Sequence, residues 1–128
     1  MKVEPKDAME FVIKSLNVTY EKEYKFDEKR KFKFDFFIPQ ISCGIEYEGI
    51  FASKGTNNNF SGKSRHTNVM GYSRDATKYN LAQIDGFIVL RYTAINYGEL
   101  LNDLTILLKE YEEMKNNDNS LSLQEIKN

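Results

Sequence analysis

The sequence is poor in the residues that build disulfides and zinc sites. It has 128 residues but a single cysteine, Cys43, and a single histidine, His66. One cysteine excludes an internal disulfide and any zinc site built from several cysteines. Cys43 precedes a glycine in an apolar stretch, which favours a small core residue over a reactive nucleophile.

Long apolar runs are also absent. No segment approaches the ~20 residues that a membrane helix needs, and charges at the N-terminus stand where an export signal needs an apolar stretch. We therefore expect a cytoplasmic protein without membrane contact. The composition, 41% hydrophobic and 29% charged, favours one packed domain over residues 1–115, and residues 116–128 are expected to form a flexible tail.

Neither sign of charge dominates, since the formal net charge is −1, but the charges are unevenly distributed. Residues 22–34 contain six basic residues against three acids, and residues 53–74 contain four basic residues and no acid. Such segments are most often solvated surface. They indicate nucleic-acid binding only in combination with the acidic cluster at residues 46–48, which lies between them.

Hydrophobic periodicity predicts three helices and four strands. The expected helices cover residues 5–16, 72–85 and 96–114. The expected strands cover residues 19–26, 31–38, 42–50 and 87–92, the last as a buried parallel strand, and a polar loop is expected at 53–67. The first three strands are expected to form an antiparallel meander, and the helix before the fourth a crossover to a parallel neighbour. The predicted fold class is α/β, a mixed central sheet with helices on its faces.

Two of these strands carry acids opposite their large apolar residues. In the second strand, Phe34 and Phe36 are expected on one face and Asp35 on the other. In the third strand, Glu46 and Glu48 share a face. If the two strands pair, these three carboxylates converge on one side of the sheet.

Three carboxylates at close range repel one another unless a cation neutralises them. Oxygen ligands suit a hard ion such as Mg²⁺ or Mn²⁺. Such an ion can polarise a phosphate oxygen and lower the pKa of a water molecule, so the cluster predicts phosphodiester hydrolysis. The alternative is a solvent-facing acidic edge paired with Lys31 and Lys33.

A lysine would complete such a site by stabilising negative charge in the transition state. Lys78 is the best candidate, because it shares a helix face with Leu81 and Ala82 and points to the site if those two pack on the sheet. Asp75 lies on roughly the same face. It could hold Lys78 or a water molecule, or it could be a helix-start charge favoured by the dipole.

Several segments together resemble a group of small PD-(D/E)XK nucleases common in phages and prophages, related to the very short patch repair endonuclease and the Holliday-junction-resolvase-like branches. The segments are EYKF (23–26), RKFKFDF (30–36), IEYEG (45–49), SRH (64–66), GYSRDATKYN (71–80) and GFIVLRYT (86–93). Their order and spacing carry the likeness, over more than half of the chain. The resemblance implies a restriction-endonuclease-like αβββαβ core, here followed by a C-terminal helix.

The resemblance also implies a division of roles. Asp35 and Glu46 take the places of the two metal-binding acids, and the backbone carbonyl of Tyr47 that of a further ligand. Glu48 stands where the usual lysine would be, a departure that the similar phage nucleases share. Lys78 on the following helix then takes the catalytic role of that lysine, with Glu48 as a further catalytic acid.

The remaining assignments leave alternatives open. Glu23 aligns with an upstream acid and could be an outer metal ligand, with Glu10 as its rival. Arg91 could meet phosphate or form a salt bridge. A lone loop histidine such as His66 is more often unremarkable than catalytic, but it could contact a phosphate. The expected DNA-binding residues are Lys33, Lys63, Arg65, His66 and Arg74.

The expected activity is a Mg²⁺- or Mn²⁺-dependent endodeoxyribonuclease for phage DNA processing or recombination. Direction by DNA structure is favoured over direction by sequence, because little chain remains outside the core to read bases. The alternative is a catalytically silent module that binds DNA or protein. Retention of the acids favours the enzyme, since binding does not need them and they repel phosphate. A homodimer, in which two sites cut two strands, is also open.

Overall fold

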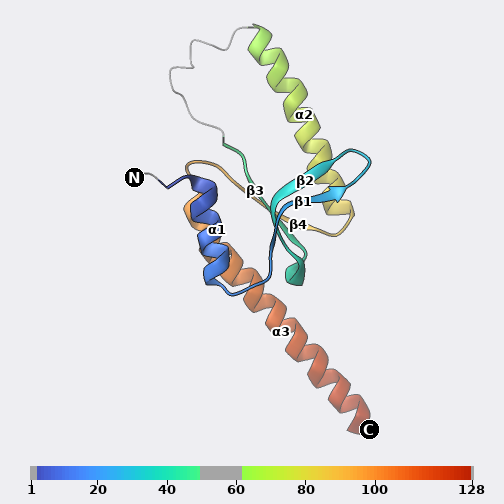
Figure 1. Cartoon of the computed structure of the whole chain (residues 1–128). Coiled ribbons are helices and arrows are strands. Elements are labelled where there is room, and N and C mark those ends of the chain that lie inside the picture. Colours follow the sequence, from blue (N-terminus) through green and yellow to red (C-terminus); the bar gives the residue numbers. More distant parts are fainter. Residues whose placement is uncertain (1–2, 50–61, 128) are drawn as a thin grey trace.

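The computed structural model describes residues 3–49 and 62–127, with side chains described at 3–49 and 69–118. The described part is an α/β structure with the order of helices and strands predicted from the sequence (Figure 1). The helices are α1 (Pro5–Ser15), α2 (Gly62–Ile84) and α3 (Leu100–Lys127). The strands are β1 (Glu21–Asp27), β2 (Phe32–Ile38), β3 (Cys43–Tyr47) and β4 (Ile88–Tyr92).

The four strands form one mixed sheet in the order β1-β2-β3-β4. The first three pair antiparallel, and β4 joins β3 in parallel after α2. This confirms the predicted meander and crossover. The prediction that the fourth strand is buried is wrong. It lies at the edge of the sheet, with Ile88 and Arg91 exposed, because it has a neighbour on one side alone.

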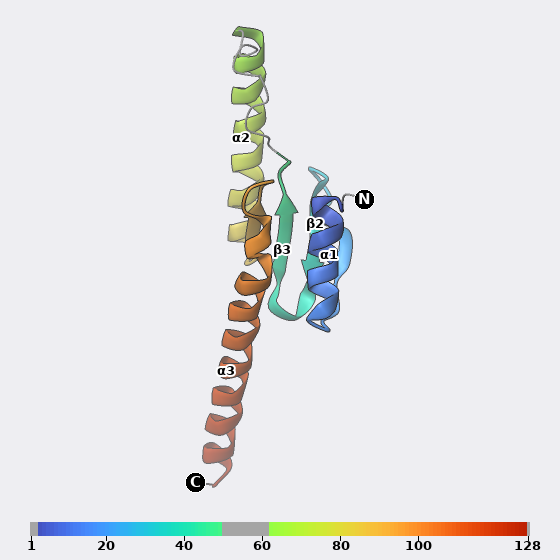
Figure 2. The same cartoon turned by 90° about the vertical axis from the view of Figure 1, so that its left-hand side faces the viewer.

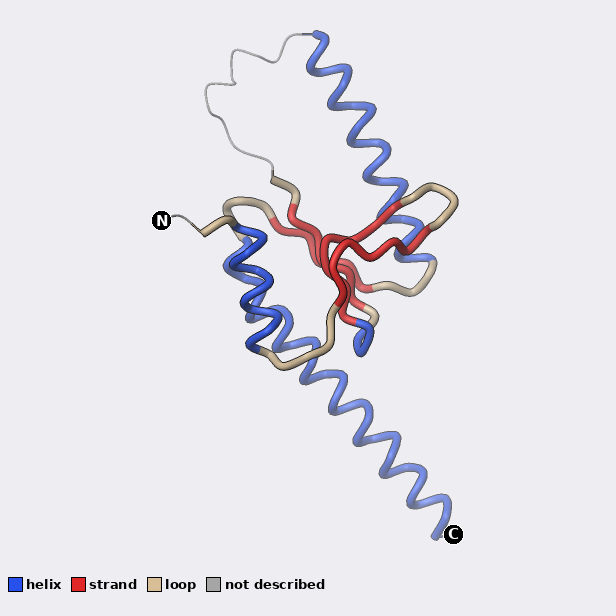
Figure 3. Tube along the Cα trace, viewed as in Figure 1, coloured by secondary structure: helices blue, strands red, loops and turns tan. Residues whose placement is uncertain are grey.

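Helices cover both faces of the sheet (Figures 1 and 3). On one face, α1 and α3 enclose the main core, which includes Ile38 and Ile45. On the other face, α2 contributes Ala82 to a smaller cluster with Phe34 and Phe37. The two long helices extend past the sheet in opposite directions (Figures 1 and 2).

The buried side of α1 is formed by Met9 and Ile13, whereas Phe11 is 73% exposed. Cys43 is fully buried in the main core, and burial raises the pKa of its thiol to about 12. Cys43 is therefore a protonated packing residue at neutral pH, as predicted.

Both long helices exceed their predicted bounds. α2 begins at Gly62, so residues 62–67 of the expected loop are helical, and residues 53–61 lie outside the described part. The segment is rich in Gly, Ser, Thr and Asn, whose weak helix propensity conceals this start. α3 continues to Lys127, through the segment predicted as a flexible tail.

β2 does not keep one face along its length, contrary to the prediction. Phe34 packs on the α2 side with Phe37, whereas Phe36 packs in the main core on the opposite side. Strict alternation would put Phe34 and Phe36 on one face. Opposite this point, Glu23 of β1 has a left-handed φ of 52°, which is uncommon for a residue with a side chain. The strand therefore turns about its own axis at Asp35.

Candidate active site

A close contact between β2 and β3 fixes the position of Phe34, the residue before Asp35. A Cβ atom on Gly44 of β3 would lie 2.4 Å from the ring of Phe34, which is fully buried. Glycine at this position lets the ring lie directly against the β3 backbone. Because Phe34 immediately precedes Asp35, its packing restricts where the Asp35 carboxylate can lie.

The carboxylate of Asp35 lies where regular pairing between β2 and β3 ends. The last paired residue of β3 is Ile45. Further along β3, the Tyr47 N–H donates a hydrogen bond to Asp35 Oδ2 at 2.8 Å. The other carboxylate oxygen is 3.1 Å from Lys6 Nζ on α1. Asp35 is thus held beside the peptide bond that follows Glu46.

Glu46 is the one charged residue classed as buried among the described residues. Its Oε1 atom is 2.7 Å from Lys78 Nζ, which reaches the sheet from α2. Burial raises the pKa of Glu46 to about 7. The Lys78 ammonium opposes this rise, and the negative charge of Asp35 adds to it. Glu46 can therefore gain or lose a proton near neutral pH. Lys78 points to the site, as its helix face predicted.

Glu48 lies just after the end of β3 and lines the same pocket as Glu46, but it has its own cation. Arg91 of β4 forms an ion pair with it, with Nε 2.7 Å from Oε1. The Arg91 guanidinium also lies over the ring of Tyr79, 4.0 Å from the ring centre, as in a cation–π contact. Of the two alternatives for Arg91, the salt bridge is present in the structure.

The three carboxylates do not form one group, contrary to the prediction. Each has its own cation, and within residues 3–49 and 69–118 no three acids, cysteines or histidines lie close enough to hold a metal ion. The turn of β2 explains the difference, because it directs Asp35 to Lys6 of α1 while Glu46 faces α2. Lys31 and Lys33, the partners expected for an acidic edge, do not pair with the three acids.

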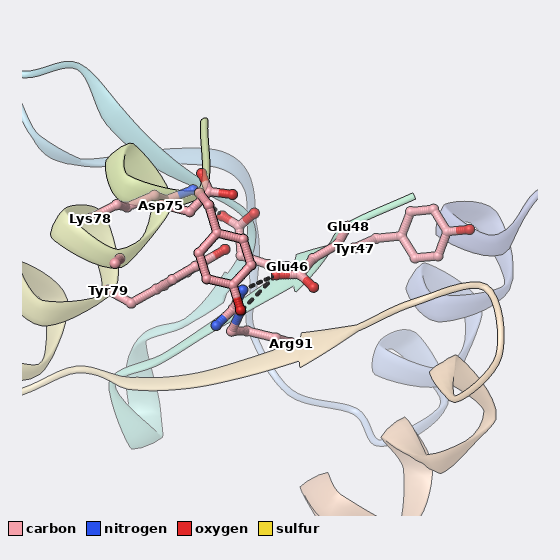
Figure 4. A pocket seen from close by; sticks show the side chains of 9 residues that line it. Glu46, Tyr47, Glu48, Asp75, Lys78, Tyr79 and Arg91 are labelled. Carbon is pink, nitrogen blue, oxygen red and sulfur yellow. Dashed lines mark hydrogen bonds and ion pairs between the residues drawn. The ribbon is translucent and has the colours of Figure 1, made fainter. Parts of the chain in front are cut away.

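A pocket of about 340 Å³ opens between α2 and the ends of β3 and β4 (Figure 4). From α2 it is lined by Tyr72, Asp75, Lys78 and Tyr79, and from the strands by Glu46, Glu48 and Arg91. The ring of Tyr47 points away from it in Figure 4. A smaller hollow of about 160 Å³ lies beside α1 and includes Lys6 and Asp35. The candidate acids therefore border two separate hollows, Glu46 and Glu48 beside α2 and Asp35 beside α1.

Asp35 and Glu46 are the residues that would hold a magnesium ion, although they border different hollows in the structure. Mg²⁺ keeps several of its water ligands and is commonly held by one or two carboxylates together with phosphates of the substrate. These two acids flank one peptide bond and offer oxygen atoms alone, which suits Mg²⁺ or Mn²⁺. The backbone carbonyl of Tyr47 would be the further ligand implied by the resemblance. Binding would require Lys6 and Lys78 to release the carboxylates that they now neutralise.

The two candidates for an upstream acid lie apart from Glu46. Glu23 is 3.4 Å from Lys33 and borders the smaller hollow. Glu10 accepts a hydrogen bond from the Tyr20 hydroxyl at 2.5 Å, and it pairs with a neighbouring lysine as well. Both acids are near Asp35 rather than in the larger pocket.

The predicted DNA-binding residues fall mainly on α2. The side chains of Lys63, Arg65 and His66 lie outside the part that is described, although their backbone is helical. Arg74 lies 6.0 Å from the ring centre of Phe32 and is exposed.

Sequence reasoning missed Lys6, Tyr72 and Tyr79. Tyr72, Asp75 and Tyr79 stand at helical spacing, three and four residues apart, which was the available signal that both tyrosines share the pocket. No signal in the sequence linked Lys6 to Asp35, because their contact depends on how α1 packs beside the sheet.

Comparison with known proteins finds no matching family model, no matching curated protein and no matching solved structure. The resemblance to PD-(D/E)XK nucleases therefore rests on the sequence segments alone. Within the described ranges, no helix is both long enough and apolar enough to cross a membrane.

Proposed function

We propose that this chain is a Mg²⁺- or Mn²⁺-dependent endodeoxyribonuclease with a PD-(D/E)XK-type site on a restriction-endonuclease-like core. One arrangement supports the proposal more than any other. Asp35 binds the amide that follows Glu46, and Glu46 binds a lysine from the helix between β3 and β4. Two acids on neighbouring strands and a lysine on the next helix are the parts that the sequence resemblance implies.

In this proposal, Asp35 and Glu46 would hold the cation that acts on a phosphate of the DNA. When bound, the cation would polarise a phosphate oxygen and favour ionisation of the attacking water. Hydrolysis would form a bond from the water oxygen to phosphorus and break the bond to the 3′-oxygen. The attacking water would lose one proton to solvent and the departing 3′-oxygen would take one up, which leaves a 5′-phosphate and a 3′-hydroxyl. Lys78, once released by Glu46, would donate a hydrogen bond to the negative charge that develops on phosphate.

The partner in this proposal is DNA, and the basic stretch at residues 53–74 would provide contacts to its backbone. The small size of the domain favours recognition of DNA shape, such as a junction, flap or nick. An enzyme of this kind, encoded by a phage or prophage, would act in the cytoplasm of the host cell.

A second candidate is a silent binding module on the same fold. It is favoured by the internal neutralisation of all three acids, which are already paired with Lys6, Lys78 and Arg91. A protein of this kind would bind DNA but leave it intact with any divalent cation. Cleavage decides between the two candidates.

The test is incubation of the purified chain with junction, flap, nicked and linear DNA, with Mg²⁺, Mn²⁺ or EDTA. The proposal expects cutting of at least one substrate with a divalent cation and none with EDTA. Binding without cutting in every cation would support the silent module instead.

Single substitutions then assign the cutting to this site. Asp35→Ala and Glu46→Ala should abolish cleavage without lowering DNA affinity, since each removes a negative charge. Lys78→Ala should reduce the rate by roughly 10²–10³-fold, as expected for the loss of one transition-state donor. Asp118→Ala, an exposed position on α3, is the control and should cut normally. Unchanged cleavage in either acid variant would contradict the site.

A further inference from the structure

The pocket beside Glu46 contains groups that the hydrolytic reaction does not use. Tyr72 lines it with a side chain that is 80% exposed, and Asp75 lines it with no ion-pair or hydrogen-bond partner among the described residues. Both lie on the side of α2 that faces the strands. An exposed aromatic ring beside a carboxylate that no described side chain neutralises offers a stacking surface and a hydrogen-bond acceptor.

The size and chemistry of the pocket fit one nucleobase. Its volume of about 340 Å³ is at the lower end of the ~300–1,000 Å³ of ligand sites. Every base has a flat face that can stack on an aromatic side chain. The Asp75 carboxylate can only accept hydrogen bonds when ionised, so it suits an exocyclic amino group such as that of cytosine.

A base within a duplex cannot use these groups. Its faces are covered by neighbouring bases and its pairing edge is occupied, so it must first leave the stack. A base that is already unpaired avoids this cost. A pocket that holds a base in this way would favour DNA with a single-stranded segment over fully paired DNA.

We propose that this pocket holds an unpaired, amino-bearing base of the DNA substrate, with Tyr72 as the stacking surface and Asp75 as the acceptor. The inference rests on the proposed nuclease function for its choice of DNA as ligand. The base would occupy the pocket beside Glu46 and Lys78, so the bond to be cut would lie close to the junction between single-stranded and paired DNA. This gives the proposed enzyme a substrate class, DNA with a tail, flap or gap.

The first measurement is DNA affinity by fluorescence anisotropy in EDTA, where cleavage cannot interfere. The probes are one duplex without a tail and the same duplex with a short tail of cytosines or of thymines. We expect the cytosine tail to improve affinity by about tenfold, as for one stacked base. The thymine tail should improve it less, because thymine lacks an exocyclic amino group.

Variants separate the stacking ring from general surface effects. Tyr72→Ala should lose the advantage of the tail, and Tyr72→Phe should keep it. Phe11→Ala is the matched control, since Phe11 is 73% exposed on α1 and outside the pocket. Asp75→Ala should bring the cytosine and thymine tails to equal affinity. Because this variant loses a negative charge, its affinity for all probes should rise. The informative quantity is therefore the ratio of its affinities for the cytosine tail and the thymine tail.

Three outcomes would overturn the base site: equal affinity for tailed and untailed DNA, no measurable binding of any probe, or equal losses in Tyr72→Ala and Phe11→Ala. Addition of Mg²⁺ to the same probes tests the nuclease separately. Tyr72-dependent tail binding without cutting would leave the base site standing and refute the nuclease. Cutting without preference for a tail would support the nuclease and refute the base site.

Discussion

Lys6 occupies the position of a competitor for the proposed cation. Its ammonium is 3.1 Å from Asp35, and it remains charged at neutral pH. Burial alone would lower the pKa of Lys6, but the hydrogen bond and charge of Asp35 raise it. A divalent ion that binds Asp35 must displace this ammonium, so the ion pair weakens the binding of that ion.

Removal of this competitor should strengthen cation binding. We expect Lys6→Met to bind Mg²⁺ or Mn²⁺ about tenfold more tightly than the wild type by isothermal titration calorimetry. Lys22→Met is the matched control, because Lys22 borders the same hollow but pairs with Glu10. Weaker binding in Lys6→Met than in the control would mean that Lys6 supports the cation site rather than blocking it.

Burial of Glu46 has a cost that depends on pH. Its pKa is raised from 4.5 to about 7, so the folded protein holds this proton more tightly than the unfolded chain does. Between these two pH values the unfolded chain binds fewer protons at this position. The contribution of Glu46 to stability therefore falls as pH rises from about 4.5 to about 7, and it stays constant above that.

Glu46→Gln should remove this pH dependence. Relative to the wild type, the variant should gain about 3 kcal/mol in free energy of unfolding between pH 4.5 and 7, from the size of the pKa shift. Chemical denaturation at a series of pH values measures the difference. Parallel pH profiles for the two proteins would show that Glu46 has an ordinary pKa in the folded state.

At the scale of elements, β2 and β3 are joined by a contact that tolerates no side chain. Gly44→Ala would place its methyl group 2.4 Å from the buried Phe34 ring. We expect a loss of about 1–3 kcal/mol or more in the free energy of unfolding, as for an overpacked core. Gly71→Ala on α2 is the control, since a Cβ there meets no atom within 4 Å, and it should be neutral or stabilising. Equal stability of the two variants would contradict this packing.

The sequence was sufficient to predict which elements form and in what order, because their hydrophobic patterns are strong. The pairing of β3 with β4 followed from the helix between them. The sequence could not predict which face of the sheet each β2 side chain takes. The strand turns at Asp35, opposite Glu23, and the left-handed φ of Glu23 is not indicated by residue propensity. The early start of α2 was hidden by residues that are common in loops.

The candidate site, too, could be predicted only in part from the sequence. The direction of Lys78 toward the acids could be predicted from the helix face that it shares with Leu81 and Ala82, and its distance of 2.7 Å from Glu46 agrees. The separation of Asp35 from Glu48 could not be foreseen, because it depends on the turn in β2. Lys6 and Arg91 were not identified as the partners of these acids, since tertiary packing brings them there.

At the scale of the whole molecule, a bound cation should stabilise the fold. A ligand that binds the folded state alone adds about 2.7 kcal/mol when its concentration is a hundredfold above its Kd. We therefore expect saturating Mg²⁺ to raise the Tm of the wild type by roughly 5 °C or more. Asp35→Asn should show no such rise in differential scanning fluorimetry. An equal rise in both proteins would place the bound ions elsewhere on the surface.

The long helices also determine how the molecule moves through solution. α3 has 28 residues and is about 42 Å long, and it continues past Tyr111, the last of its residues packed on the main core. α2 extends to the opposite side (Figure 2). A monomer of this outline has greater hydrodynamic drag than a sphere of 15.0 kDa. It would therefore elute early from a sizing column and could be mistaken for a dimer, whereas sedimentation equilibrium, which is insensitive to shape, would give the true mass.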